Sequence, residues 1–205
     1  MRVLAKIPAR SSADLRAGAL RRRDLEAFGE LLDGLGPARS VLITGEAQGR
    51  RNAAAGLAAV AAARGTRTAL LECDLVTPGL ADALGIARAP GLHEYLLGSA
   101  EAQQILKPLV LAGPASAQAT EPLVCVAAGR PAAAGTALLA SERFGAAVSN
   151  LSEAYELLVI DGPPPGRPHE LLAAMACAET TLAFVDSAER QPGLPAPVDG
   201  LLVEA

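Results

Sequence analysis

The sequence is poor in aromatic residues and has no excess of positive charge. Phe and Tyr together make up 2% of the 205 residues, and there is no Trp. The core must therefore be built from Leu, Val and Ala. The net charge is −4 at pH 7, which gives no general attraction to nucleic acid or to anionic lipid. We expect no nucleic-acid partner.

Cysteine is scarce as well, and long apolar runs are absent. Cys73, Cys125 and Cys177 lie far apart in apolar settings without a metal-binding spacing, so we expect buried, reduced thiols in a reducing compartment. No apolar run approaches the ~20 residues that span a bilayer. The apolar stretch near the N-terminus is too short for a signal peptide. These features predict a cytoplasmic protein.

What the chain has in quantity is apolar sequence in alternating β and α patterns. Hydrophobic residues make up 51% of it, which suits one domain with a substantial core. The alternation predicts a doubly wound α/β fold, with a mostly parallel sheet and helices on both faces. We expect residues 1–11 to be a flexible lead-in and 12–205 to form a single domain. Strands are expected over 40–44, 68–75, 123–129, 156–162, 181–187 and 200–205, and the longer helices over 12–35, 51–64, 136–154 and 169–178.

The segment "VLITGEAQGRRN" at 41–52 has the pattern of a phosphate-binding P-loop without its key residues. In a working P-loop, backbone amides cradle the phosphates, a Lys reaches the β- and γ-phosphates, and a Ser or Thr hydroxyl ligates Mg²⁺. Gly45 and Gly49 offer flexible backbone. Arg50 or Arg51 takes the place of the Lys, and Arg51 or Asn52 that of the hydroxyl. The alignment is ambiguous by one residue.

These replacements favour the loss of ATP hydrolysis. A planar guanidinium fits a tight phosphate loop less well than an ammonium, and neither Arg nor Asn supplies the hydroxyl ligand. The only lysines, Lys6 and Lys107, are remote in sequence. Weak nucleotide binding without turnover and true activity remain as alternatives.

Three acidic residues stand at the ends of two apolar strands. Asp161 ends one strand, where a Walker-B Asp would hold Mg²⁺ through water, and Glu72 and Asp74 end another. The carboxyl ends of strands in an open α/β sheet face the ligand crevice, so Asp74 and Asp161 should point toward the glycine segment. The alternative is that such acids only cap neighbouring helix N-termini.

Several motifs in this order resemble the cytoplasmic domain of bacterial tyrosine kinases. These P-loop proteins are related to the MinD/ParA ATPases and govern capsule and exopolysaccharide synthesis and export. The resemblance covers residues 15 to 187. Its most specific pieces are "PGL" and "LLG" within 90–98, and "LASERF" at 139–144, which precedes Tyr155 and the Asp161 strand at the family's spacing.

The resemblance implies site roles for individual positions. Gly49 and Arg50 fall on the P-loop Gly-Lys, Asp161 on the Walker-B Asp, and Glu72 and Asp74 on the two acids of a further Walker-type motif. In the family, the first of those two acids helps to hold the metal and to activate the tyrosine hydroxyl. Here that position is Glu72, whose carboxylate is displaced by one methylene.

Four departures from the family point in one direction. The P-loop Lys and hydroxyl are missing, and the tyrosine-rich tail is absent, since Tyr95 and Tyr155 are the only tyrosines. A Pro-rich segment at 188–198 replaces elements that help to shape the base pocket. The family's oligomerisation motif is not cleanly recognisable, although Arg16 and Arg21–Arg23 occupy its area. Together the departures indicate a degenerate kinase.

We therefore expect a catalytically inactive, kinase-like subunit that regulates or scaffolds exopolysaccharide or capsule synthesis and export. Its expected partners are the cytoplasmic ends of a membrane polysaccharide co-polymerase or an active kinase relative, which would bring it to the inner face of the plasma membrane. It could also form a homo-oligomer. No cofactor is expected, and ATP with Mg²⁺ would bind only if the site works. The alternatives are an active tyrosine kinase that uses arginine, or a MinD/ParA-like ATPase.

Overall fold

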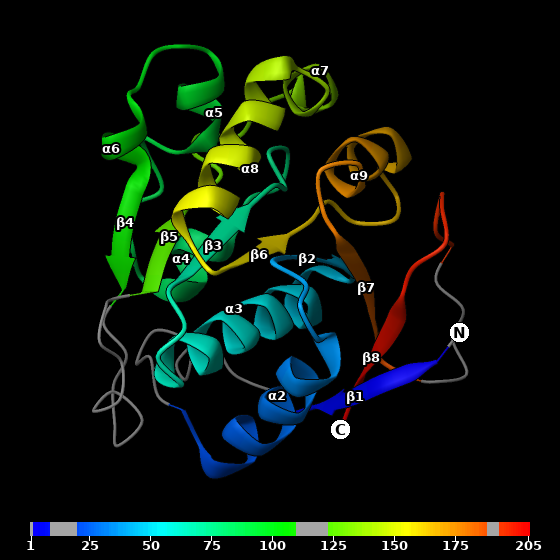
Figure 1. The fold of residues 1–205 in the computed structure, drawn as a ribbon. Helices are drawn as coiled ribbons and strands as arrows, with labels where there is room; N and C mark the ends of the chain where they lie inside the picture. The colour runs from blue at the N-terminus through cyan, green and yellow to red at the C-terminus, as the bar shows by residue number, and fades with distance from the viewer. Residues whose placement is uncertain (1, 9–19, 110–122, 188–192) are drawn as a thin grey trace.

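The computed structural model has a mostly parallel sheet of eight strands, and it describes residues 2–8, 20–109, 123–187 and 193–205 (Figure 1). The strand order is β1-β8-β7-β2-β6-β3-β5-β4, and only β4 runs antiparallel to its neighbour. The strands are β1 (Val3–Ile7), β2 (Ser40–Gly45), β3 (Thr68–Glu72), β4 (Leu106–Leu109), β5 (Leu123–Val126), β6 (Leu157–Asp161), β7 (Thr180–Val185) and β8 (Gly200–Glu204).

Helices cover both faces of this sheet. The helices of the described residues are α2 (Arg22–Leu35), α3 (Ala47–Ala63), α4 (Leu80–Leu84), α5 (Leu92–Leu96), α6 (Ala102–Ile105), α7 (Gly135–Leu139), α8 (Glu142–Ala154) and α9 (Pro168–Met175). Val41 and Ile43 of β2 point into one core with α2 and α3, whereas Leu42 points into the opposite core with α5, α8 and α9. The predicted doubly wound α/β fold is therefore confirmed.

Helix α3 is the central element of the first core. It is rich in alanine and glycine, and nearly all of its residues from Arg50 onward are buried. Because these side chains are small, the helix axis can lie close to the sheet, and α3 contacts β2, β3, β5, β6 and β7. This position brings the first turn of α3 over the carboxyl ends of the middle strands.

Some sequence-based boundaries are wrong. Residues 3–7, expected within a flexible lead-in, form β1 and pair in parallel with β8. Helix α3 begins at Ala47, four residues before the expected start at 51. The helix expected over 136–154 is interrupted, because the Ser141 side chain accepts a hydrogen bond from the Phe144 amide and starts α8 afresh.

Other expectations are met in part. The helix predicted over 12–35 is present as α2 from Arg22 onward, and residues 12–19 lie outside the described residues. In the Pro-rich segment, residues 193–198 form no helix or strand, and 188–192 are not described. Strand β4 and helix α6 were not predicted. Among the described helices, none has the length and apolar character needed to cross a bilayer.

Candidate functional site

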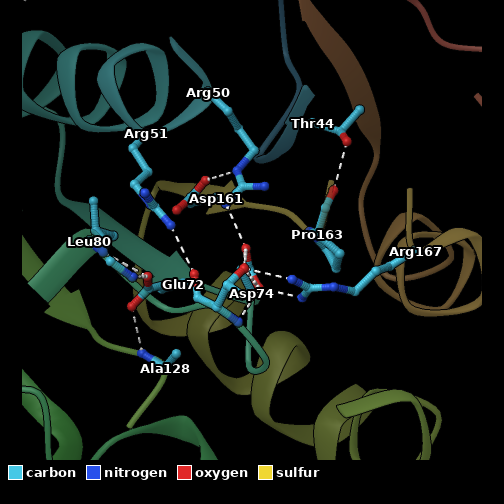
Figure 2. A network of polar contacts seen from close by, with 12 residues as sticks. Thr44, Arg50, Arg51, Glu72, Asp74, Leu80, Ala128, Asp161, Pro163 and Arg167 are labelled. Atoms are coloured by element: carbon cyan, nitrogen blue, oxygen red, sulfur yellow. Dashed lines mark hydrogen bonds and ion pairs between the residues drawn. The ribbon is translucent and has the colours of Figure 1, made fainter. Parts of the chain in front are cut away.

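The predicted site residues converge where three parallel strands end. Glu72, at the end of β3, is the register partner of Asp161, at the end of β6, and Asp161 is in turn the partner of Ile43 in β2. The first turn of α3 follows β2 directly and lies over these ends. Figure 2 shows Arg50, Asp74 and Asp161 gathered at this point, with Glu72 beside them.

The turn between β2 and α3 is shorter than a phosphate-binding loop requires. Only Glu46 separates Gly45 from Ala47, and the Arg50 amide already donates to the Glu46 carbonyl at 2.9 Å. Gly49 and Arg50 therefore belong to the helix rather than to a flexible loop. The expectation that Gly45 and Gly49 provide the flexible backbone of a phosphate-binding loop is wrong. Ala47 and Gln48 already belong to the helix, so that it begins before Gly49.

The Phe184 residue of β7 occupies the space beside this turn. A Cβ atom on Gly49 would lie 1.9 Å from Phe184 Cε1, so glycine is required by the close approach of the ring. Gly45 has φ of 137°, and a Cβ there would lie 2.4 Å from the Phe184 carbonyl oxygen. Both glycines thus serve the packing of the turn against β7.

Gly49→Ala is expected to destabilise the protein by about 1–3 kcal/mol, the usual cost of overpacking a core. The double variant Gly49→Ala, Phe184→Leu should be less destabilised than the sum of its two single variants, because the smaller side chain removes the clash. Urea unfolding followed by circular dichroism measures both effects. A flexible, solvated loop at this position would instead tolerate Gly49→Ala without loss.

The Arg50 side chain joins two carboxylates in the interior. Its Nε donates to Asp161 Oδ1 at 2.5 Å and its Nη2 donates to Asp74 Oδ2 at 3.1 Å (Figure 2). The side chains of Arg50 and Asp161 are 0% exposed, and that of Asp74 is 1% exposed. Arg50 thus bridges two of the three acids that were expected to serve a metal ion, Asp74 and Asp161.

The electrostatics of this group follow from burial and pairing. Burial raises the pKa of Asp161 to about 6, against the attraction of Arg50, and the nearby Glu72 adds to the rise. Burial also works to lower the pKa of Arg50, but Asp161 and Asp74 together raise it above the ordinary arginine value. The attraction between Arg50 and Asp161 thus favours the charged form of both groups, whereas burial opposes it.

Asp74 has a second cationic partner at the rim of the site. Arg167 Nη1 lies 2.5 Å from Asp74 Oδ1, and Arg167 Nη2 donates to Thr77 Oγ1 at 2.6 Å. The Thr77 amide also donates to Asp74 Oδ1 at 2.9 Å. Burial works to raise the pKa of Asp74, but the Thr77 amide, Arg167 and Arg50 outweigh it and lower that pKa.

The Glu72 carboxylate accepts hydrogen bonds from backbone amides and is not free to bind a ligand. Its Oε1 accepts hydrogen bonds from the amides of Gly79 and Leu80 at 2.6 and 2.7 Å, and its Oε2 accepts one from the Ala128 amide at 2.9 Å. The extra methylene lets the carboxylate reach these three amides. The alternative interpretation, in which the acids at strand ends cap neighbouring helix N-termini, therefore fits Glu72.

The remaining predicted residues lie around this centre and contact other groups. Arg51 Nη2 donates to the Thr77 carbonyl at 2.9 Å, and Asn52 Oδ1 accepts from Gln48 Nε2 at 3.0 Å. The Thr44 hydroxyl, which sequence reasoning did not single out, donates to the Pro163 carbonyl at 2.7 Å.

Sequence reasoning also missed Arg167, Thr77 and Phe184. Arg167 follows the strand that ends at Asp161. A basic residue at that place was the only sequence feature that could have indicated its contact with Asp74.

These residues do not fit a bound Mg²⁺–nucleotide. The first turn of α3 offers no extended glycine loop, and Phe184 is packed against Gly49. The place between Asp74 and Asp161 is taken by the Arg50 guanidinium. Within the described part of the chain, no group of three or more His, Cys, Asp or Glu side chains is arranged to hold a metal ion.

Comparison with known proteins finds similarity to tyrosine kinases at the sequence level. The tyrosine-protein kinase Wzc of Salmonella typhi is 30% identical over 116 residues, which are 57% of this chain and 15% of that protein. The chain thus spans a small fraction of the length of the curated relatives that it matches. No protein-family model matches the chain.

Solved structures extend the similarity to the fold. The kinase domain of the Escherichia coli tyrosine kinase ETK superposes with a TM-score of 0.76 at 16% identity, covering 100% of this chain and 90% of that one. The septum site-determining protein MinD of Pyrococcus horikoshii, solved with Mg-ADP, gives a TM-score of 0.57 at 19% identity over 71% of this chain and 56% of MinD. The expected resemblance is confirmed: the chain is similar in sequence to a bacterial tyrosine kinase and has the fold of the bacterial tyrosine-kinase domains.

Proposed function

We propose that this chain is a non-catalytic, tyrosine-kinase-like subunit that acts by binding within the bacterial machinery for exopolysaccharide or capsule synthesis and export. The observation that carries the proposal is the buried contact of Arg50 with Asp161 and Asp74. The residue at the P-loop lysine position faces inward and neutralises the acids, so it is not available to a phosphate group. The similarity to Wzc supports the kinase lineage.

The energetics of this contact oppose catalysis. A kinase would have to free Arg50 for the phosphates, which would leave Asp161 and Asp74 buried without that cation. Removing one partner of a buried ion pair costs about 3–5 kcal/mol, or roughly two to four orders of magnitude in nucleotide affinity. The same cost would weaken nucleotide binding whether the chain were an arginine-dependent kinase or a MinD/ParA-like ATPase.

The two tyrosines support the same reading. Tyr95 lies in α5, half-buried, with the Arg143 guanidinium 4.7 Å from the centre of its ring. Tyr155 is the half-buried residue that ends α8. Each is engaged in the fold, and phosphorylation of either would disturb packing. The tyrosines of this chain are thus poor acceptors for transfer between copies.

In this proposal the chain works at the cytoplasmic side of the membrane through a partner. The partner is the cytoplasmic end of a polysaccharide co-polymerase or an active kinase relative.

Two assays test the proposal. Purified chain incubated with ATP and Mg²⁺ is expected to release no more ADP, and to gain no more phosphotyrosine, than the Asp161→Ala variant, with the ETK kinase domain as the active control. A pull-down with the cytoplasmic segments of a co-polymerase from the same genome is expected to retain the chain without nucleotide. ADP release at the rate of the ETK domain would overturn the proposal.

A further inference from the structure

An apolar pocket lies on the face of the sheet opposite α3. It opens between α8 on one side and α5, α6 and the strands β4 and β5 on the other (Figure 1). Of the eleven described residues that line it, eight are aliphatic, two are tyrosines and one is an asparagine. The mechanism proposed above uses none of them for binding.

The pocket exists because helix α8 presents small side chains to it. Ala147, Asn150, Leu151 and Ala154 line the pocket, and their spacing places them on one face of the helix. Two of the four are alanines, so the helix does not fill the space between itself and α5 and α6. Protein interiors are normally packed without such gaps. This face of α8 therefore leaves room for a ligand of defined size.

The volume of the pocket sets the size of that ligand. An apolar cavity of about 150 Å³ accepts a benzene molecule and holds no water. The pocket beside α8 has a volume of about 220 Å³, which is room for one aromatic ring with a short side chain. Pockets for drug-sized ligands begin at about 300 Å³. A nucleotide is thus too large for this pocket, and it is also too polar for the lining.

Two tyrosine rings favour an aromatic ligand over an aliphatic one. Tyr95 of α5 and Tyr155, which ends α8, both line the pocket and are both half-buried. Aromatic rings in contact attract each other beyond the effect of the area that they bury. A planar ring therefore gains more in this pocket than an alkyl chain of similar size.

A cation stands at one end of the pocket. Arg143 precedes Ala147 by four residues and so lies on the same face of α8. Its guanidinium lies 4.7 Å from the centre of the Tyr95 ring. Arg143 is exposed, and the ion pairs among the described residues do not include it. Its charge is thus available to an acidic group on a ligand.

We propose that this pocket binds a small aromatic carboxylate, with the ring among the apolar side chains and the carboxylate beside Arg143. The inference goes beyond the proposed function, because the pocket does not include Arg50, Asp74 or Asp161 and needs neither nucleotide nor a partner protein. A bound ligand joins α8 to α5 and α6. The folded chain is therefore stabilised by the ligand through mass action.

Hydrocinnamate, a phenyl ring on a short chain with a terminal carboxylate, is the probe. The neutral hydrocinnamyl alcohol tests the role of charge, and octanoate tests the role of the ring. Binding is followed by the amide chemical shifts of the ¹⁵N-labelled chain. Ala147→Leu fills the pocket, whereas Ala146→Leu adds the same side chain at an exposed neighbouring position of α8. Arg143→Met removes the cation.

Hydrocinnamate is expected to bind the wild type with a Kd of about 0.1 mM and to shift amides of α5, α6 and α8. Ala147→Leu should weaken this binding by about tenfold, because the added side chain overpacks the occupied pocket, and Ala146→Leu should leave it unchanged. Arg143→Met should weaken hydrocinnamate binding by about threefold, as expected for an exposed ion pair, and should not affect the alcohol. Octanoate should bind about fivefold more weakly than hydrocinnamate.

No shift with hydrocinnamate up to about 5 mM, far above the expected Kd, would overturn the site, and so would full affinity in Ala147→Leu. If Ala147→Leu does not fold, Ala154→Leu, at an exposed lining position, is judged by the same criterion. Octanoate binding as tight as that of hydrocinnamate would overturn the aromatic class, and unchanged affinity in Arg143→Met would overturn the role of the carboxylate. ATP turnover by the wild type would contradict the proposed function and leave the pocket to these titrations.

Discussion

Arg50→Met is expected to lower the free energy of unfolding by about 3–5 kcal/mol at pH 7, the usual result of removing one partner from a buried ion pair. The substitution keeps an unbranched apolar stem, shorter than that of arginine, and removes the charge that faces Asp161 and Asp74. Both carboxylates would then lie in the interior without their shared counter-ion, and Asp161 would have no cation in direct contact among the described residues. Urea unfolding monitored by circular dichroism measures the loss.

The matched control is Arg22→Met on the surface of α2. Arg22 pairs with Glu26 at 2.8 Å, but their side chains are 92% and 59% exposed. Exposed pairs contribute little to stability, so this variant should stay within about 0.5 kcal/mol of the wild type. A loss below about 1 kcal/mol for Arg50→Met would mean that the buried contact is not a structural element, since such pairs normally cost several kcal/mol to break.

Glu72→Ala is expected to be about as damaging, with a loss of roughly 3–5 kcal/mol. The buried amides of Leu80 and Ala128 and the half-buried amide of Gly79 would lose their acceptor together, and each unpaired buried donor costs about 1–3 kcal/mol. Glu72→Asp, which restores the acid type of the kinase family, should also destabilise, because the shorter side chain cannot reach all three amides. Urea unfolding again gives the free energies.

Hydrogen exchange adds a local readout for Glu72. The amides of residues 79, 80 and 128 should exchange faster in Glu72→Ala, while amides in β8 should change only as far as the global stability does. The control Glu26→Ala, on the exposed face of α2, should alter neither region. Unchanged protection at all three amides in Glu72→Ala would show that Glu72 does not hold this backbone.

Much of the fold follows from apolar runs alone. The strands β2, β3 and β6 are short and fully buried, and such runs between helical segments indicate a parallel sheet. Their carboxyl ends necessarily meet, which places Asp74 and Asp161 together. The edge strand β1 was missed, because its half-exposed residues give no comparable apolar run.

The contacts inside the site could not be predicted from sequence patterns. Arg50 meets Asp161 across 111 residues and Asp74 across 24, and nothing local specifies which acid it meets. The register of α3 decided the outcome. With the helix starting at Ala47, Arg50 falls on the side that faces the strand ends and is buried there. A helix that began at residue 51 would have left it in a loop.

The most direct measurement is isothermal titration of the wild-type chain with ATP and Mg²⁺, beside the ETK kinase domain as a binding control. With Arg50 held by Asp161 and Asp74, we expect no heat of binding up to about 1 mM nucleotide. A dissociation constant of 1 mM corresponds to a binding free energy of about −4 kcal/mol, so any weaker binding would escape detection. Micromolar binding that disappears in Asp161→Ala would contradict the occupied site and, with it, the non-catalytic role.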